Sequence, residues 1–121
     1  MKALKSDKQR GLNIVIIGCG KVGTSLVEKL SRENHDITVI DKDPEKIRSI
    51  IDSYDVIGIA GNGASFSVQM EAEVPNADIL ISVTQSDELN LLCCIVAKRA
   101  SNCETIASVP TPDYSNEAEY L

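Results

Sequence analysis

IVIIGCGKVG at residues 14–23, followed by a helical pattern and then by ITVID at 37–41, decides the fold of this chain. A buried strand, a G-x-G-x-x-G turn, a helix, a second buried strand and a terminal acid follow one another in the order of the β-α-β unit that holds dinucleotides. This full context makes the glycine motif specific. It disfavours the alternative of a tight turn that binds nothing.

The three glycines of this turn have separate tasks in such a unit. Gly18 permits the sharp exit from the strand, Gly20 lets the backbone approach a pyrophosphate, and Gly23 lets the helix lie close to the sheet. The first N–H groups of the helix face that pyrophosphate and favour a negative group. Asp41 is expected to accept the ribose hydroxyls of the adenosine half, which favours NAD(H) over NADP(H), although Lys42 beside it would soften the repulsion of a 2′-phosphate.

The chain carries an excess of acidic side chains. Eighteen Asp and Glu stand against twelve Lys and Arg, a formal net charge of −6, which argues against binding to nucleic acid or to an anionic membrane surface. No apolar run approaches the length that a bilayer span requires. Residues 1–11 are polar and lysine-rich, without a signal-peptide pattern, so the sequence predicts a flexible leader at 1–11 and one domain at 12–121.

The four cysteines indicate a reducing compartment. They form no C-x-x-C pair and the chain has a single histidine, His35, so no zinc site is expected. Cys93 and Cys94 lie in an apolar helical pattern and are expected to fill the core. Cys19 lies inside the glycine turn at a helix N-terminus, where its pKa could be lowered, although a small filling residue is the simpler interpretation. The cysteine pattern therefore favours a cytoplasmic location.

Short apolar runs alternate with helical patterns along the chain. The expected strands are 14–17, 37–40, 56–60, 79–83 and 105–109. The expected helices are about 21–34, one opened by Pro44, a short one at roughly 64–74 and one at about 86–100. This alternation predicts an α/β fold: a Rossmann-like doubly wound parallel sheet of at least five strands, in the order 3-2-1-4-5, with helices on both faces.

The helical patterns also predict which faces are buried. The inward residues are expected to be Val22, Leu26, Val27 and Leu30 in the first helix and Ile47, Ile50 and Ile51 in the second. The helix at 86–100 is apolar on nearly all sides. Either the sheet covers it more than usual or a second subunit does, and the second interpretation is favoured because an outer helix on a small sheet has little else to contact.

Five motifs in register give the chain a family resemblance. They are GKVG at 20–23, ENHD at 33–36, VIDKDP at 39–44, GNG at 61–63 and VTQSDELN at 83–90. With them the stretch 14–109 resembles the TrkA-N type of nucleotide-binding domain, also called KTN or RCK N-terminal, found in the regulatory subunit of Trk-type potassium uptake. A C-terminal lobe usually follows in this family, and it is expected to be missing from this chain.

The resemblance implies a sensor and not an enzyme, with no catalytic residue and no metal ligand. In the family the domain binds NAD or NADH, and in some members ATP or ADP. Ligand state changes the arrangement of a homodimer or larger ring, and that change sets the flux through an integral membrane potassium transporter subunit. The chain would therefore lie in the cytoplasm, held at the inner face of the cell membrane by this partner, without direct insertion into the bilayer and without bound nucleic acid.

The resemblance also implies a set of binding residues, carried over by position. Gly18, Cys19, Gly20, Lys21, Val22 and Gly23 would line the pyrophosphate, Asp41 and Lys42 the adenosine ribose, Ala60, Gly61 and Asn62 the adenine, and Val83 and Thr84 the middle of the cofactor. Two of them have a simpler alternative. Asn62 can serve turn chemistry alone, and Thr84 can serve as the entry to the helix that follows.

The cofactor domain of an NAD-dependent dehydrogenase is the alternative function. Hydride transfer needs a substrate site and usually an acid or base beside the nicotinamide. His35 is expected at the end of the first helix, far from the carboxyl edge of the sheet, and no second domain is expected to hold a substrate. A dimerisation scaffold that has lost its ligand is disfavoured by the intact glycines and by Asp41.

Overall fold

The computed structural model describes residues 11–108 of the chain. Its elements are β1 (Asn13–Ile17), α1 (Lys21–Ser31), β2 (Asp36–Asp41), α2 (Pro44–Ser53), β3 (Ile57–Ala60), α3 (Phe66–Glu71), the 3-10 turn η2 (Val74–Asn76), β4 (Ile79–Ser82), α4 (Asp87–Ala100) and β5 (Glu104–Ala107). The expected leader, apart from Gly11, and the end of the expected domain at 109–121 lie outside the described residues.

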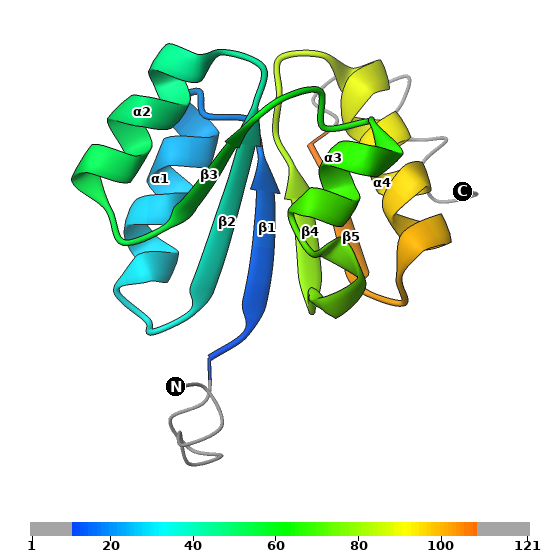
Figure 1. Cartoon of the computed structure of the whole chain (residues 1–121), viewed down its shortest axis with the longest axis horizontal. Coiled ribbons are helices and arrows are strands. Elements are labelled where there is room, and N and C mark those ends of the chain that lie inside the picture. Colours follow the sequence, from blue (N-terminus) through cyan, green and yellow to red (C-terminus); the bar gives the residue numbers. More distant parts are fainter. Residues whose placement is uncertain (1–10, 109–121) are drawn as a thin grey trace.

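The five strands form one parallel sheet in the predicted order β3-β2-β1-β4-β5 (Figure 1). Ile17 at the end of β1 lies beside Ile40 of β2 and Ser82 of β4. The strand order therefore reverses between β1 and β4. In open sheets of this kind, ligands bind outside the carboxyl ends of the strands at such a reversal.

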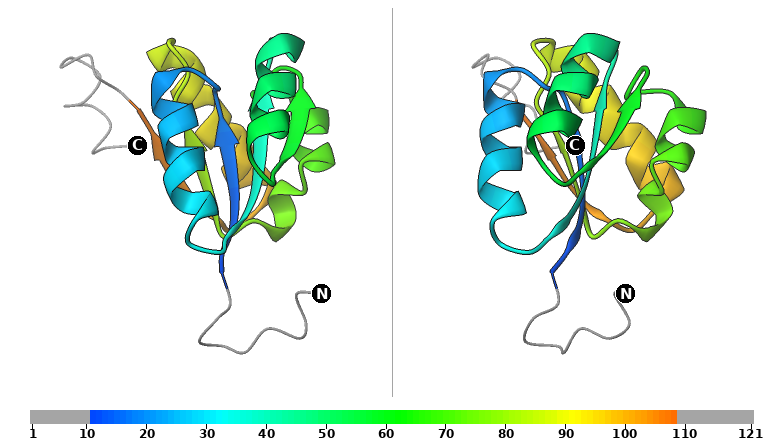
Figure 2. Two further views of the ribbon diagram at one scale, coloured as in Figure 1. Left: turned by 90° about the vertical axis from the view of Figure 1, so that its left-hand side faces the viewer. Right: turned by 60° about the vertical axis from the view of Figure 1, so that its left-hand side comes forward.

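Alternate residues of the strands build two cores, one on each face of the sheet. On one face α1 and α2 cover a cluster that includes Ile14, Ile16, Val27, Ile37, Val39, Ile47 and Ile50. On the other face α3 and α4 cover Val15, Ile17, Ile40, Leu80, Cys93 and Ala97. The right-hand view of Figure 2 shows α1 and the α3–α4 pair on opposite sides of the strands. Burial on both faces explains why the strand sequences are almost continuously apolar.

Local sequence signals set the helix ends. α1 ends at Ser31, three residues short of the expected end, and Asn34 then adopts a left-handed φ of 65°. α2 begins at Pro44, and Asp43 caps it by accepting a hydrogen bond from Glu45 N at 2.9 Å. The helix of the third crossover is shorter than the expected 64–74, because α3 spans only six residues and is followed by Glu73 at φ 59° and the turn η2.

The prediction that Val22 and Ile51 point inward is wrong. Val22 is 57% exposed, because five residues at 3.6 per turn put it about 140° around α1 from the fully buried Val27. Ile51 is 43% exposed, although its end lies over Gly58 of β3. The remaining positions of both stripes are buried or half-buried.

Among residues 11–108, the fully buried side chains of helix α4 lie on one of its faces. Asn90, Cys93 and Ala97 face the sheet and are fully buried, whereas Leu92 is 48% and Ile95 is 53% exposed. The prediction that a second subunit covers the outer side of α4 therefore stays a prediction. None of the helices between residues 11 and 108 has both the length and the apolar character needed to traverse a bilayer.

Candidate functional site

A crevice of about 570 Å³ opens at the carboxyl ends of β1, β2 and β4, where the strand order reverses. Predicted site residues that line it are Gly18, Cys19, Gly20, Asp41, Lys42, Gly61, Asn62, Val83 and Thr84. The other predicted residues, Lys21, Val22, Gly23 and Ala60, do not line it, although each is next to or within three residues of one that does. The fold thus brings together four segments of the chain that lie between Ile17 and Leu89.

The glycine turn has the geometry of a cradle. Gly18 has a φ of 112°, and its N–H donates to Ile40 O at 2.8 Å. A Cβ atom on Gly23 would lie 1.8 Å from Gly18 O, so the helix can approach the turn only because this residue has no side chain. A Cβ atom on Gly20 would meet no heavy atom within 4 Å beyond its chain neighbours. Its space is open, as the approach of a ligand would require.

The start of α1 is left without a cap. Gly20 is the N-cap residue, and no side chain accepts a hydrogen bond there. The other three α-helices in residues 11–108 are capped by side chains of their own, those of Asp43, Ser65 and Ser86. The uncapped N–H groups of the first turn of α1 are therefore positioned for an external anion.

Asp41 is fixed by the protein itself. Its Oδ2 accepts from Cys19 N and its Oδ1 from Asp43 N, both at 2.8 Å, while its main-chain oxygen accepts from Gly61 N at 2.9 Å. The sequence analysis predicted only a ligand-binding role for Asp41 and missed that its carboxylate also holds the glycine turn through Cys19 N. Each carboxylate oxygen retains acceptor capacity, so the group can still receive ribose hydroxyls.

Two lysines add positive charge to the rim of the crevice. Lys42 was predicted from its place after Asp41, whereas Lys46 was missed. The signal for Lys46 was present, because a helix opened by Pro44 carries Lys46 in its first turn, next to the end of β2. Both lysines are exposed, so they are free to move toward a phosphate.

The structure favours the simpler of the two interpretations of Cys19, a small filling residue, over a thiol of lowered pKa. Burial raises the pKa of its thiol to about 12, and the nearby negative charge of Asp41 acts in the same direction, while Lys46 opposes it. The side chain is 8% exposed and belongs to the core on the α1 side of the sheet. Cys19 is thus a small filling residue whose backbone lines the crevice.

The Gly61–Gly63 loop forms the side of the crevice next to β3. Asn62 Oδ1 accepts from Ala64 N at 2.9 Å, and Asn62 O accepts from Ser65 N at 2.9 Å. Turn chemistry therefore accounts for the side-chain oxygen of Asn62. Gly63 is buried, and its carbonyl accepts from Gln69 Nε2 at 2.8 Å.

The end of β4 is organised by Asn90, a fully buried residue that sequence reasoning missed. Asn90 Oδ1 accepts from Thr84 N at 2.8 Å and lies 2.7 Å from Thr84 Oγ1, while Asn90 Nδ2 donates to Ser108 O at 2.8 Å. Thr84 Oγ1 also accepts from Ser86 N at 3.2 Å. Thr84 therefore lines the crevice and, at the same time, serves the entry to α4. A lone amide within the apolar pattern of α4 was the available signal.

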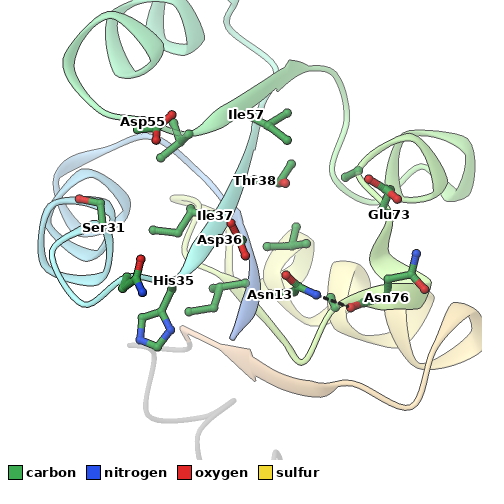
Figure 3. Close-up of a pocket in the computed structure, with 16 residues that line it drawn as sticks. Asn13, Ser31, His35, Asp36, Ile37, Thr38, Asp55, Ile57, Glu73 and Asn76 are labelled. Carbon is green, nitrogen blue, oxygen red and sulfur yellow. Dashed lines mark hydrogen bonds between the residues drawn. The ribbon is translucent and has the colours of Figure 1, made fainter. Parts of the chain in front are cut away.

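A second hollow, of about 660 Å³, lies at the opposite, amino ends of the strands (Figure 3). Asp36, Asp55 and Glu73 line it, and none of its described lining residues is a Lys or Arg. This charge repels phosphate. His35 lies here, where its Nδ1 accepts from Leu12 N at 2.9 Å, at the far end of β2 from the crevice. Within the described part of the chain no cluster of His, Cys, Asp and Glu could hold a metal ion.

The sequence profile of the family described as the TrkA-N domain matches residues 14–121. The Trk system potassium uptake protein TrkA of Vibrio alginolyticus is 37% identical over 111 residues, which cover 91% of this chain and 24% of that protein. TrkA of Halomonas elongata is 42% identical over 86 residues, 71% of this chain and 19% of that protein. The chain thus spans about a quarter or less of the length of these relatives.

Two solved structures of GsuK share the fold. The GsuK channel bound to NAD has a TM-score of 0.79 at 22% identity, with 96% of this chain and 21% of that chain covered. GsuK bound to ADP has a TM-score of 0.78 at 20% identity, with 91% and 29% covered. At these identities the likeness concerns the arrangement of helices and strands.

Proposed function

The chain belongs to the TrkA-N domain family, and on that premise we propose that it is the cytoplasmic NAD(H)-binding regulatory domain of a membrane potassium transport system. The observation that carries this proposal is the uncapped start of α1, which faces an open crevice beside a fixed carboxylate. An anion held by backbone amides next to an acceptor for ribose hydroxyls is the arrangement that an adenine dinucleotide needs.

The nucleotide lies along the carboxyl ends of the strands. Its pyrophosphate rests on the amides that follow Gly20, where no side chain intrudes. Asp41 accepts the adenosine ribose, and the adenine lies toward Gly61 and Asn62. The other half of the dinucleotide extends along Thr84 at the end of β4. Because Asp41 repels a 2′-phosphate, NAD and NADH bind more tightly than NADP and NADPH.

ADP and ATP are the second class of ligand that the crevice fits. They share the adenosine half and the paired phosphates with NAD, and GsuK, which has the same fold, has been solved with both NAD and ADP. The two classes differ at the β4 side, where only NAD places a second ribose. Contacts with Thr84 and the adjoining β4–α4 connection would therefore distinguish them.

The proposed role is regulation and not catalysis. The charged side chains that line the crevice are those of Asp41, Lys42, Asp43 and Lys46, all on the adenosine side. The far side, where the nicotinamide would lie, is lined by Val83, Thr84, Gln85, Ser86 and Leu89, none of which is a general acid or base. This distribution supports a sensor over the dehydrogenase alternative.

Regulation proceeds through the arrangement of subunits. Ser86 and Leu89 of the α4 region line the crevice, while Leu92 and Ile95 on the outer side of α4 are half-exposed. We assign that outer side to the contact with a second copy in a homodimer or larger ring. A ligand that fits two arrangements unequally shifts their populations, and the shift is passed to the membrane subunit.

Calorimetric titration of the chain with NAD, NADH, ADP and ATP tests the binding proposal. At a ligand concentration 100 times Kd, a ligand specific for the folded state stabilises it by about 2.7 kcal/mol, which for a domain of this size raises Tm by roughly 10–20 °C. NADPH serves as the matched control and is expected to bind more weakly than NADH. If none of the four nucleotides gives a heat of binding or changes Tm, the proposal is refuted.

A further inference from the structure

Gln69 is a fully buried amide that joins three separate parts of the molecule. It belongs to α3, and its Nε2 donates both to Gly63 O at 2.8 Å and to Cys93 O at 3.0 Å. Gly63 belongs to the loop that borders the crevice, and Cys93 lies in the middle of α4. One side chain therefore ties the wall of the crevice to the helix that carries the exposed Leu92 and Ile95.

The loop has little freedom to slide at this junction. A Cβ atom on Gly63 would lie 2.4 Å from Ile17 Cγ2 and 3.3 Å from Cys93 Sγ. The Gly63 backbone thus sits directly on the end of β1, one residue before the glycine turn, and on α4. A displacement of this loop would press on both neighbours because close-packed interiors transmit strain.

The amide of Gln69 leaves one of its two polar atoms without a partner among residues 11–108. Both partners of Gln69 are carbonyl oxygens, so the nitrogen must face them, and Oε1 has no hydrogen-bond partner within the described residues. A buried acceptor without a partner is unfavourable, and an apolar side chain of similar volume would avoid it only by giving up both hydrogen bonds from Nε2. What the amide provides instead is a fixed link between the crevice loop and α4.

We propose that Gln69 is a positioning residue that couples occupancy of the crevice to α4, through the Gly63 carbonyl on one side and the Cys93 carbonyl on the other. This inference rests on the proposed nucleotide-binding function. When the nucleotide contacts the Gly61–Gly63 loop and displaces it, the link draws α4 along with it. The outer side of α4, with Leu92 and Ile95, then reports the state of the crevice to whatever covers it.

Hydrogen–deuterium exchange on the full chain tests the link with Gln69→Met, which keeps the length of the side chain and removes both hydrogen bonds. Ile50→Val, a core change on the opposite face of the sheet, is the control for a general loss of stability. Without nucleotide, Gln69→Met is expected to raise exchange in residues 61–65 at least fivefold and to leave β1 and β2 unchanged. Saturating NAD is expected to slow exchange in α4 in the wild type and in Ile50→Val. In Gln69→Met this slowing of exchange is expected to be at least fivefold smaller.

Each outcome has one meaning. If NAD protects α4 equally in Gln69→Met and in the wild type, the coupling is refuted although binding stands. If the wild type binds no nucleotide, the proposed function fails first, and the nucleotide-free comparison still decides whether Gln69 secures the loop. Should Gln69→Met not fold, Gln69→Asn, which keeps the amide but is one methylene too short to bridge both carbonyls, replaces it with the same expected results.

Discussion

Replacing Gly20 by serine should stabilise the folded domain and weaken nucleotide binding at the same time. Gly20 has φ −77° and ψ −162°, extended values that any residue adopts, and its Cβ position is empty. A compatible replacement of glycine contributes about 0.4–1 kcal/mol by restricting the unfolded chain. A serine at the N-cap adds a few tenths of a kcal/mol relative to glycine. Together these give about 1 kcal/mol, a Tm increase of roughly 4–8 °C without ligand.

The same serine competes with the ligand. Its hydroxyl accepts from the first-turn amides of α1, and its Cβ occupies the space through which a pyrophosphate would approach. Loss of one hydrogen bond to a charged group costs about 1.5–3 kcal/mol. Kd for NAD should therefore rise roughly 10-fold to 150-fold.

Two measurements on three proteins decide the matter. Tm without ligand and Kd for NAD are compared for the wild type, Gly20→Ser and Gly20→Ala, the last of which adds the Cβ atom without the capping hydroxyl. Gly20→Ala should weaken binding less and leave Tm nearly unchanged, because alanine is a poorer N-cap residue than glycine and this offsets the restriction of the unfolded chain. A higher Tm with an unchanged Kd in Gly20→Ser would show that the pyrophosphate does not bind at the start of α1. A lower Tm would show that the cap position is not open.

Three further predictions follow from the site. Asp41→Lys removes two 2.8 Å hydrogen bonds that backbone N–H groups donate to the carboxylate, so it should lower the free energy of unfolding by about 3 kcal/mol and abolish NAD binding. In the same urea unfolding experiment the control Asp52→Lys, at an exposed position, should change the free energy of unfolding by no more than about 0.5 kcal/mol. Asn90→Ala frees buried partners at the ends of β4 and β5 and should cost about 3 kcal/mol, and a loss under 1 kcal/mol would contradict the assigned network. Burial raises the pKa of Cys19 from 9.0 to about 12, so the unfolded chain releases this proton first as pH rises. The stability of the wild type should therefore fall between pH 9 and 12 more steeply than that of Cys19→Ser, and parallel curves would contradict the shift.

The architecture could be predicted from the sequence alone because strands buried on both faces are almost continuously apolar in sequence. Continuous Val and Ile runs at β1 and β2, separated by a glycine turn and a helical pattern, admit few folds, and the strand order was confirmed in full. Helix faces were harder to predict. Val22 matches an apolar stripe by spacing alone, but it lies in the first turn of α1, about 140° from Val27 and away from the sheet.

The amides that hold the site together could not be predicted in this way. Asn90 and Gln69 are polar residues within helices, where an argument from periodicity assigns polar residues to the surface. Their burial is decided by the partners that the fold supplies, namely carbonyls of Ser108, Gly63 and Cys93. Those partners lie between 6 and 24 residues away in the chain, so no local pattern contains them.

The distribution of helix caps provides the strongest physical argument for a ligand. Asp43, Ser65 and Ser86 each accept a hydrogen bond from the first turn of α2, α3 and α4, so α1 is the one α-helix in residues 11–108 that begins without a capping side chain. At α1 the sequence places a glycine instead and forgoes the stability that a serine would contribute. Nearby, Asp41 is held by Cys19 N and Asp43 N, which fixes an acceptor beside the open amides before any ligand arrives. A site whose donors and acceptor are already in position binds with little reorganisation. The uncapped turn and the fixed carboxylate therefore act together, and a variant that blocks the amides or replaces the carboxylate should bind the nucleotide more weakly.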